Sequence, residues 1–353
     1  MNYNMYKLFI ILLIGYGYSI TAEDIYDDSW ALIVGINNYQ KTSNLDYAVE
    51  DAISMASLLT DNFNFPKQNL KILTNEEATL FNIKNSLMEI STSAKENDRV
   101  LIYFAGHGVT MDLPGGGEMG YLLPVNGQPS NLFSTSLPMD DLKKISSMSK
   151  SKHMLFLIDA CYGGLAATGS RGLNSSVPNY ISKIAHDKSR QIITAGGKGE
   201  EVIEKSEWGH SAFTLNLIRA LKDGRADLND DGYITADELG LFLKEKVTID
   251  SDNQQTPQSR RFTSHEGEFI FINQVDKLII KNDNSSNIKD SPEMDYDVLA
   301  DIIASKLKNE KAMGSDQKEI NRIKKVDMSI ALGSKSNKGL TLFSSLSSAQ
   351  MNK

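Results

Sequence analysis

The chain has 353 residues, a formal net charge of −8 and a single cysteine. This length accommodates two domains, or one large domain with a tail. The acidic balance argues against nucleic-acid binding, which needs a basic face, and a hydrophobic fraction of 41% is too low for a multispanning membrane protein. A single cysteine excludes an intrachain disulfide, so Cys161 is either an inert core thiol or a reactive one.

The N-terminus has the pattern of a secretory signal peptide. An apolar run over 8–20 follows Lys7, and the small residues Ser19 and Ala22 offer cleavage sites, although Ile20 fits the cleavage pattern poorly. The run is shorter than the roughly 20 residues of a membrane span. We therefore expect residues 1–22 to be a signal peptide and the mature protein to be secreted or periplasmic, with no membrane span in the mature chain. The alternative is a retained N-terminal anchor.

After residue 28, strand and helix patterns alternate. Continuous apolar runs predict strands at 30–36, 70–73, 100–106, 154–160 and 191–196. Apolar residues at helical spacing predict helices over 49–59, 80–90, 211–222 and 236–247. This alternation predicts an α/β fold with a mostly parallel central sheet and helices on both faces.

Two Gly- and Ser-containing stretches, 109–136 and 162–189, directly follow the third and fourth predicted strands. They leave the carboxyl ends of those strands, where open α/β sheets place their ligands. From residue 274 to 353, Lys, Asn, Asp and Ser dominate and strand patterns disappear, which predicts a mostly disordered tail.

A histidine and the cysteine stand at the ends of two of these strands. The sequence FAGHG covers 104–108 and DACYGG covers 159–164, so His107 and Cys161 are separated by 54 positions. A neutral imidazole beside a thiol can take its proton, and the imidazolium then stabilises the thiolate and later protonates the leaving amine. The backbone N–H groups of Gly108 and Cys161 are candidate oxyanion donors.

These motifs resemble the caspase/metacaspase family of clan CD cysteine peptidases, in its bacterial metacaspase form. The resemblance covers 29–272 and includes LDYAVEDA at 45–52, GHSAFT at 209–214 and QTPQ at 255–258. It implies a caspase-like three-layer sandwich, with a large part over 29–170 and a small part over 190–272. It also implies a cysteine endopeptidase that acts on protein or peptide substrates without an organic cofactor.

The residues around the dyad imply a preference for basic substrates. Asp159 stands where animal caspases have glutamine; an acid there resembles the metacaspases, which cleave after Arg or Lys. Asp51 falls where similar proteins have a second pocket acid, although it is also open to interpretation as a solvated helix residue. Ala105 departs from a serine common in relatives. We interpret the other histidines as structural or surface residues: His153, His186, His210 and His265.

The segment DLNDDGYITADE at 227–238 matches the EF-hand loop template at every fixed position. It predicts Ca²⁺ binding through the following six residues: Asp227, Asn229, Asp231, Tyr233, Thr235 and Glu238. The alternative is a tight turn in which Thr235 caps the next helix and Glu238 completes a capping box. Asp140 and Asp141 resemble half of a separate acidic calcium site of some metacaspases.

The sequence therefore predicts an exported cysteine endopeptidase that cleaves after Arg or Lys and is modulated by calcium. Self-processing is expected in the inter-part loop, at Arg171, Lys188 or Arg190. The competing hypothesis is a catalytically inactive module of the same fold that binds calcium or a partner.

Overall fold

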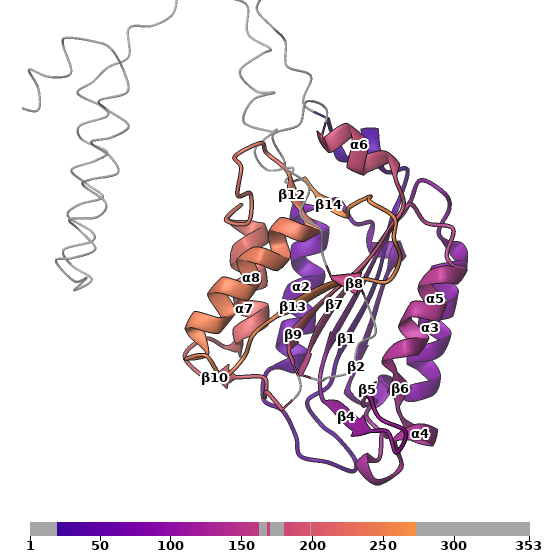
Figure 1. Ribbon diagram of the computed structural model, residues 1–353, viewed down its shortest axis with the longest axis vertical. Helices are drawn as coiled ribbons and strands as arrows, with labels where there is room; N and C mark the ends of the chain where they lie inside the picture. The colour runs from indigo at the N-terminus through magenta and orange to yellow at the C-terminus, as the bar shows by residue number, and fades with distance from the viewer. Residues whose placement is uncertain (1–19, 162–167, 170–179, 198, 273–353) are drawn as a thin grey trace, which may run out of the picture. The chain divides into compact units, whose positions relative to one another are not determined.

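The computed structural model describes residues 20–161, 168–169, 180–197 and 199–272, with Cys161 described in its backbone alone. A seven-stranded sheet forms the centre of this part of the chain (Figure 1). Its first five strands are parallel and its last two run antiparallel to their neighbours. In sheet order the strands are β2 (Leu70–Thr74), β1 (Ser29–Gly35), β3 (Arg99–Ala105), β7 (His153–Cys161), β9 (Ser189–Gly196), β13 (Gln258–Arg261) and β8 (Thr168–Gly169).

Helices cover both faces of this sheet, giving the three layers of a caspase-like sandwich (Figure 1). Along β1, Ile33 packs toward one face and Leu32 and Val34 pack toward the other, as the period of two along a strand requires. One face packs against α2 (Ala48–Asn62), α7 (Ala212–Lys222) and α8 (Ala236–Asp250), and the other against α3 (Leu80–Ser93) and α5 (Met139–Met148). The predicted α/β fold class is confirmed.

The predicted loop over 109–136 contains regular structure. It forms a small antiparallel sheet of β4 (Gly108–Asp112), β5 (Glu118–Leu122) and β6 (Leu137–Pro138), with α4 (Leu132–Thr135) between the last two strands. Periodicity did not reveal the hairpin because its strands are short. The remaining short elements are η1 (Lys67–Asn69), η2 (Asn75–Glu77), η3 (Pro129–Asn131), α6 (Tyr180–His186), β10 (Glu204–Lys205), β11 (His210–Ser211), β12 (Ile234–Thr235) and β14 (Ile270–Phe271).

The described chain begins with a segment that packs on the domain. Thr21 caps helix α1 (Ala22–Ile25) with a capping box, and Ala22 and Ile25 are buried in a cluster with Ile184 and Ile270. The folded part therefore starts before the predicted boundary at residue 22. The predicted signal run over 8–20, up to residue 19, and the predicted tail over 274–353 lie outside the described residues. Among the described helices, none has the length and apolar character needed to cross a bilayer.

Candidate active site

The sheet register brings the two predicted catalytic residues to the same level. Strands β3 and β7 are parallel neighbours, and Ala105 lies opposite Asp159. His107 lies two positions after Ala105, just past the end of β3, and Cys161 lies two positions after Asp159, at the end of β7, so both are at the carboxyl edge of the sheet. A hydrogen bond of 3.2 Å from Gly106 N to Asp159 O continues the pairing beyond the end of β3. The thiol of Cys161 lies outside the described part of the structure.

The imidazole of His107 has a defined tautomer. Its Nε2 lies 2.9 Å from the carbonyl oxygen of Ser43, an atom that can only accept a hydrogen bond. Nε2 therefore carries the proton, which leaves the lone pair of Nδ1 as the acceptor of the ring. A histidine in this tautomer is ready to act as a base at Nδ1.

Gly108 opens β4 directly after this histidine. It faces Leu122 across the hairpin, and the nearest ladder bond runs 2.9 Å from Leu123 N to His107 O. Gly108 therefore occupies a non-hydrogen-bonded position, and the ladder does not use its N–H. That N–H suits the predicted role of oxyanion donor.

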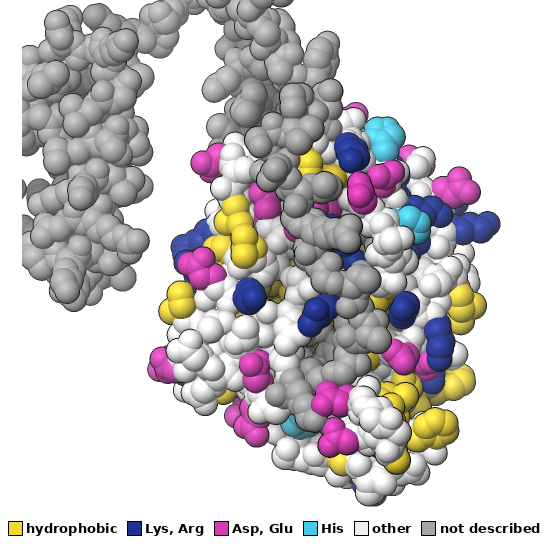
Figure 2. Space-filling view, viewed as in Figure 1, with side chains coloured by type: hydrophobic (Ala, Val, Ile, Leu, Met, Phe, Trp, Pro, Cys, Tyr) yellow, Lys and Arg dark blue, Asp and Glu magenta, His cyan; other side chains and the backbone are white. Residues whose placement is uncertain are grey.

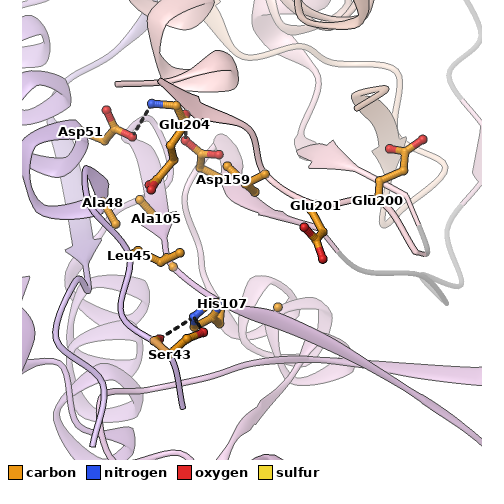
Figure 3. Close-up of a pocket in the computed structure, with 14 residues that line it drawn as sticks. Ser43, Leu45, Ala48, Asp51, Ala105, His107, Asp159, Glu200, Glu201 and Glu204 are labelled. Carbon is orange, nitrogen blue, oxygen red and sulfur yellow. Dashed lines mark hydrogen bonds between the residues drawn. The ribbon is translucent and has the colours of Figure 1, made fainter. Parts of the chain in front are cut away.

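A pocket of 390 Å³ lies between His107 and a group of acids. In Figure 3, Asp51, Glu204 and Asp159 lie at one end of the pocket, while His107 and Ser43 lie at the other. Ala105 lines its wall without supplying a polar atom. In the lower part of the face in Figure 2, near a histidine, the visible charged side chains are mostly Asp and Glu. The pocket is lined by Ser43, Leu45, Ala48, Asp51, Ala105, Gly106, His107, Gly108, Asp159, Glu200, Glu201, Val202, Glu204 and Ser211.

Asp159 is one of two fully buried acids of the pocket, with 2% of its surface exposed. Its Oδ2 accepts hydrogen bonds from Ser211 Oγ at 2.5 Å and from Thr214 Oγ1 at 2.6 Å. Its Oδ1 is buried and has no hydrogen-bond partner among the described residues. A buried polar atom without a partner is costly in a folded protein. Asp159 is one of the residues that line the pocket.

Asp51 is also buried, and it already has a partner. Its Oδ1 lies 2.6 Å from Nδ1 of His210, and its Oδ2 accepts a bond of 3.2 Å from Ser211 N at the start of α7. With 1% of its surface exposed, Asp51 is not a solvated helix acid, so that alternative is wrong. The interpretation of His210 as a structural or surface residue missed its contact with the pocket acid.

Burial dominates the proton affinity of these acids. It raises the pKa of Asp159 to about 8, with the charge of Asp51 adding to the effect and the Ser211 and Thr214 hydrogen bonds opposing it. Burial also raises the pKa of Asp51, opposed by the His210 hydrogen bond, and that of Glu204. The N-terminus of α7 provides a positive partial charge beside Asp51. The described residues that line the pocket include no Lys or Arg, so the pocket is short of positive charge.

Comparisons with known proteins decide the family. Residues 28–266 match the family described as Caspase domain. The chain belongs to this family. It is 26% identical to Metacaspase-1A of Aspergillus oryzae over 50% of this chain and 49% of that protein. It is 25% identical to Metacaspase-1 of Botryotinia fuckeliana over 62% of this chain and 52% of that protein.

The chain is also similar to a bacterial protein and to a solved structure. A probable protease of a Desulfuromonadales bacterium is 29% identical over 62% of this chain and 29% of that protein. The chain thus spans about half or less of the length of these curated relatives. A crystal structure of a Geobacter sulfurreducens protein covers 66% of this chain and 93% of that chain, with a TM-score of 0.47 and 14% identity. The caspase-domain assignment and the metacaspase relatives identify a cysteine peptidase at the level of the family.

The loop over 227–238 has the internal hydrogen bonds of a tight acidic turn. The carboxylate of Asp227 accepts bonds from Asp231 N at 3.1 Å and Gly232 N at 2.8 Å, and Asn229 Oδ1 accepts one from Asp231 N at 3.0 Å. Gly232 has φ +85°, a conformation that favours glycine. Tyr233 N donates to Asp231 Oδ1 over 3.0 Å.

The last predicted ligand, Glu238, is engaged elsewhere. Its carboxylate accepts bonds from Thr235 N at 3.0 Å and Thr235 Oγ1 at 2.9 Å, which completes the capping box of α8. Within the described residues, no three His, Cys, Asp or Glu side chains are arranged to hold a metal ion. Burial raises the pKa of Glu238, and the charges of Asp231 and Asp227 add to that increase. The observed arrangement is the capped turn, and the carboxylates remain close enough to repel one another.

The structure corrects one predicted processing site. Arg190 is buried in β9 and donates to five backbone carbonyls, those of Ser146, Ser149, Ser151, Lys152 and Ser189. It is therefore inaccessible to a peptidase in the folded protein. Lys188 is exposed, while Arg171 lies outside the described residues. Asp141 forms ion pairs with Lys84 and Lys144, which accounts for its charge without an ion.

Several site residues were missed from the sequence. Ser211 and Thr214 lie within the GHSAFT segment and bind Asp159, so that motif already contained the signal for the pocket. Glu204 had no motif around it. It lies near the pocket because its carboxylate accepts bonds from Asp46 N at 3.0 Å and Tyr47 N at 3.4 Å.

Proposed function

We propose that this protein is a cysteine endopeptidase that cleaves after Arg or Lys, with Cys161 as nucleophile and His107 as base. The observation that supports it best is the unpartnered Oδ1 of Asp159, buried in a pocket whose opposite end is formed by His107. Such an oxygen suits the guanidinium or ammonium group of a substrate. A negatively charged side chain would instead meet Asp159, Asp51 and Glu204.

The chemistry follows from the tautomer of His107. Nδ1 takes the proton of the Cys161 thiol, and the thiolate attacks the carbonyl carbon of the basic residue. The N–H groups of Gly108 and Cys161 donate to the oxyanion of the tetrahedral intermediate. The imidazolium then gives its proton to the leaving amine, and water hydrolyses the resulting thioester, which regenerates the thiol.

The two buried acids have different roles in this proposal. Asp51 is already paired with His210, so its charge is partly compensated before substrate arrives. Asp159 has a free acceptor and receives the substrate cation directly. Hydrogen bonds to charged groups contribute about 1.5–3 kcal/mol, which is enough to select a basic side chain over a neutral one.

The test uses fluorogenic peptides ending in Arg, Lys or Asp, with Cys161→Ala and His107→Ala as inactive variants. We expect hydrolysis of the basic peptides, and loss of at least about 1000-fold in each variant, as is typical when a nucleophile or its base is removed. His186→Ala is the matched control, because the hydrogen bond of this exposed histidine within the described part of the chain goes to the carbonyl of Ser182 in its own helix. A preference for Asp-ending peptides would contradict the pocket assignment.

The alternative is an inactive module of the same fold. Alkylation of Cys161 by iodoacetamide separates the two, because a thiolate activated by histidine reacts rapidly at neutral pH and a structural thiol does not. Slow alkylation together with absent peptidase activity would favour the inactive module.

Calcium binding at 227–238 is a second proposal. Its support is the proximity of three acids: burial raises the pKa of Asp231 with the charge of Asp227 adding to the effect, and burial raises the pKa of Glu238 with the charges of Asp231 and Asp227 adding to it. An ion there requires Glu238 to leave the capping box and turn its carboxylate toward the loop. No step of peptide hydrolysis depends on this ion.

Export and self-processing complete the proposal. Fractionation of cells that express the full chain tests export, with the expected protein outside the cytoplasm. Incubation of purified protein tests self-processing, with cleavage expected after Arg171 or the exposed Lys188 and absent in Cys161→Ala. Fragments that begin after Arg190 in folded protein would contradict its burial in β9.

A further inference from the structure

We propose that Tyr39 is a positioning residue of the active site, whose hydroxyl fixes the backbone of His107 so that its imidazole is aligned for proton transfer. This inference rests on the proposed role of His107 as base. The hydroxyl of Tyr39 accepts a 2.7 Å hydrogen bond from His107 N and lies 3.3 Å from Leu123 O, to which it donates. The two rings lie 4.7 Å apart with an angle of 45° between their planes.

The hydroxyl bonds to two segments that lie side by side at this point of the site. His107 ends the segment that follows β3, and Leu123 follows β5 in the adjacent hairpin. Leu123 N donates to His107 O over 2.9 Å, so both backbone polar groups of His107 are bonded. Burial raises the pKa of Tyr39 well above its ordinary value, so its hydroxyl keeps the proton that it donates.

The approach of Tyr39 depends on the glycine before His107. A Cβ built on Gly106 would lie 2.4 Å from the Tyr39 hydroxyl oxygen, closer than real Cβ contacts. The sequence AGHG therefore has a physical reason for its first glycine. Only a residue without a side chain at 106 lets the hydroxyl reach the N–H of His107.

The loop that carries Tyr39 is itself fixed by side-chain hydrogen bonds. Tyr39 N donates to Asn44 Oδ1 over 3.0 Å, and Asn37 N and Asn38 N both donate to Asn75 Oδ1 at 2.9 and 3.0 Å. The same loop provides the carbonyl of Ser43 that bonds to His107 Nε2. One rigid loop thus controls the backbone of His107 through Tyr39 and the ring of His107 through Ser43.

Loss of the hydroxyl should impair catalysis more than substrate binding. Tyr39→Phe keeps the ring that packs on His107 and leaves His107 N without its acceptor. Since small misplacement of a catalytic group can cost on the order of 100-fold in rate, we expect kcat to fall by about 10- to 100-fold with little change in KM. We also expect slower alkylation of Cys161 at neutral pH, because a displaced imidazole stabilises less thiolate.

The experiment compares Tyr39→Phe with Tyr121→Phe. Tyr121 is fully buried in β5, and its hydroxyl contacts Met119 Sδ at 2.9 Å instead of any part of the site. Both variants lose one buried hydroxyl. If their melting temperatures change by similar amounts, a fall in kcat seen only in Tyr39→Phe does not come from a general loss of stability. We expect lower kcat and a shifted pH profile of Cys161 alkylation in Tyr39→Phe alone.

The two readouts also separate this inference from the proposed function. If the wild-type protein hydrolyses no peptide but Tyr39→Phe still shifts the alkylation profile, the positioning role stands and the peptidase proposal fails. If kcat and the alkylation profile of Tyr39→Phe match those of the wild type, the positioning role is wrong. It is equally wrong if Tyr121→Phe produces the same changes.

Discussion

Two groups of acids in this protein have opposite relations to their surroundings. The pocket acids Asp51 and Asp159 are buried, and Oδ1 of Asp159 has no hydrogen-bond partner among the described residues. In the loop over 227–238, Asp231 is exposed and Asp227 is half-buried, and their oxygens accept bonds from nearby N–H groups of the same loop. The loop satisfies its own carboxylates, and the pocket leaves one unsatisfied.

This difference indicates which of the two groups of carboxylates is preorganised for a cationic ligand. A buried acid with an open acceptor has lost its water and regains a partner only when a cationic group enters, so the site is already organised for its ligand. An exposed loop that bonds to itself must exchange internal hydrogen bonds for ion contacts. The larger functional effects are therefore expected at the pocket, although the loop matches its sequence template better.

The strongest test of this comparison is Asp159→Asn. The Asn oxygen can accept the bonds from Ser211 and Thr214, while its NH2 group replaces the open acceptor and repels a substrate cation. Loss of a buried charge pair costs about 2–5 kcal/mol, so kcat/KM for Arg peptides should fall by roughly 30- to 4000-fold. Asp223→Asn, at an exposed ion pair with Arg225, is the control of equal charge. Retained activity on Arg peptides in Asp159→Asn would remove Asp159 from the pocket.

The pH dependence of cation binding gives the next largest effect. Because burial and the charge of Asp51 raise the pKa of Asp159 to about 8, much of it is protonated at neutral pH before a ligand binds. Binding of benzamidine to Cys161→Ala, measured by calorimetry, should strengthen as pH rises from 6 to 8, by up to about tenfold per pH unit. In the double variant with Asp159→Asn, binding should be weak and independent of pH. Affinity that stays constant from pH 6 to 8 in Cys161→Ala would contradict an elevated pKa.

The same group links stability to pH. Asp159 has a folded pKa of about 8 and an ordinary value of 3.8, so the folded state retains a proton that the unfolded state releases. Between these two values stability therefore falls as pH rises. Wild-type melting temperature should decline from pH 5 toward pH 8 relative to Asp159→Asn. A constant difference between the two proteins across this range would be inconsistent with the shifted pKa.

The fold was largely predictable from the sequence because its signals are local. Continuous apolar runs identified β1, β3 and β7, and glycines beside His107 and Cys161 identified the ends of neighbouring strands. The antiparallel hairpin β4–β5 was not predicted because its strands are short and half-exposed. In the helix predicted over 49–59 from its apolar spacing, Ile53 is 52% exposed, while Asp51 is buried.

The pocket was less predictable because its residues come from distant segments. The bond from His210 to Asp51 joins positions 159 apart, and that from Ser211 Oγ to Asp159 joins positions 52 apart. Hydrophobic periodicity describes residues within one helix or strand, so it does not reveal pairs this far apart in the sequence. Likewise, the template at 227–238 contained both an ion site and a capping box, and only three-dimensional geometry shows that Glu238 is bonded to Thr235.

A smaller effect, on the melting temperature, distinguishes a calcium site at 227–238 from a capped turn without an ion. If calcium binds with a Kd of about 0.1–1 mM, 10 mM calcium should stabilise the folded protein by roughly 1.4–2.7 kcal/mol. For a domain of this size that raises the melting temperature by about 3–10 °C. Asp227→Asn should lose the increase, and Asp230→Asn should keep it, because Asp230 lies at a non-ligand position and its φ of +56° suits asparagine. A wild-type melting temperature unaffected by calcium or chelator would exclude the ion.

The smallest effect concerns the cap itself. Thr235 Oγ1 accepts a bond of 3.2 Å from Glu238 N and caps α8, a contribution of about 1 kcal/mol by comparison with other N-caps. In chelator, Thr235→Ala should therefore lower the melting temperature by about 2–4 °C, and Thr235→Ser should restore most of the loss because it keeps the hydroxyl. With calcium, the increment in Thr235→Ala should persist, since the remaining template positions still supply oxygens. A variant that is unchanged in chelator but insensitive to calcium would mean that Thr235 serves the ion instead of the helix.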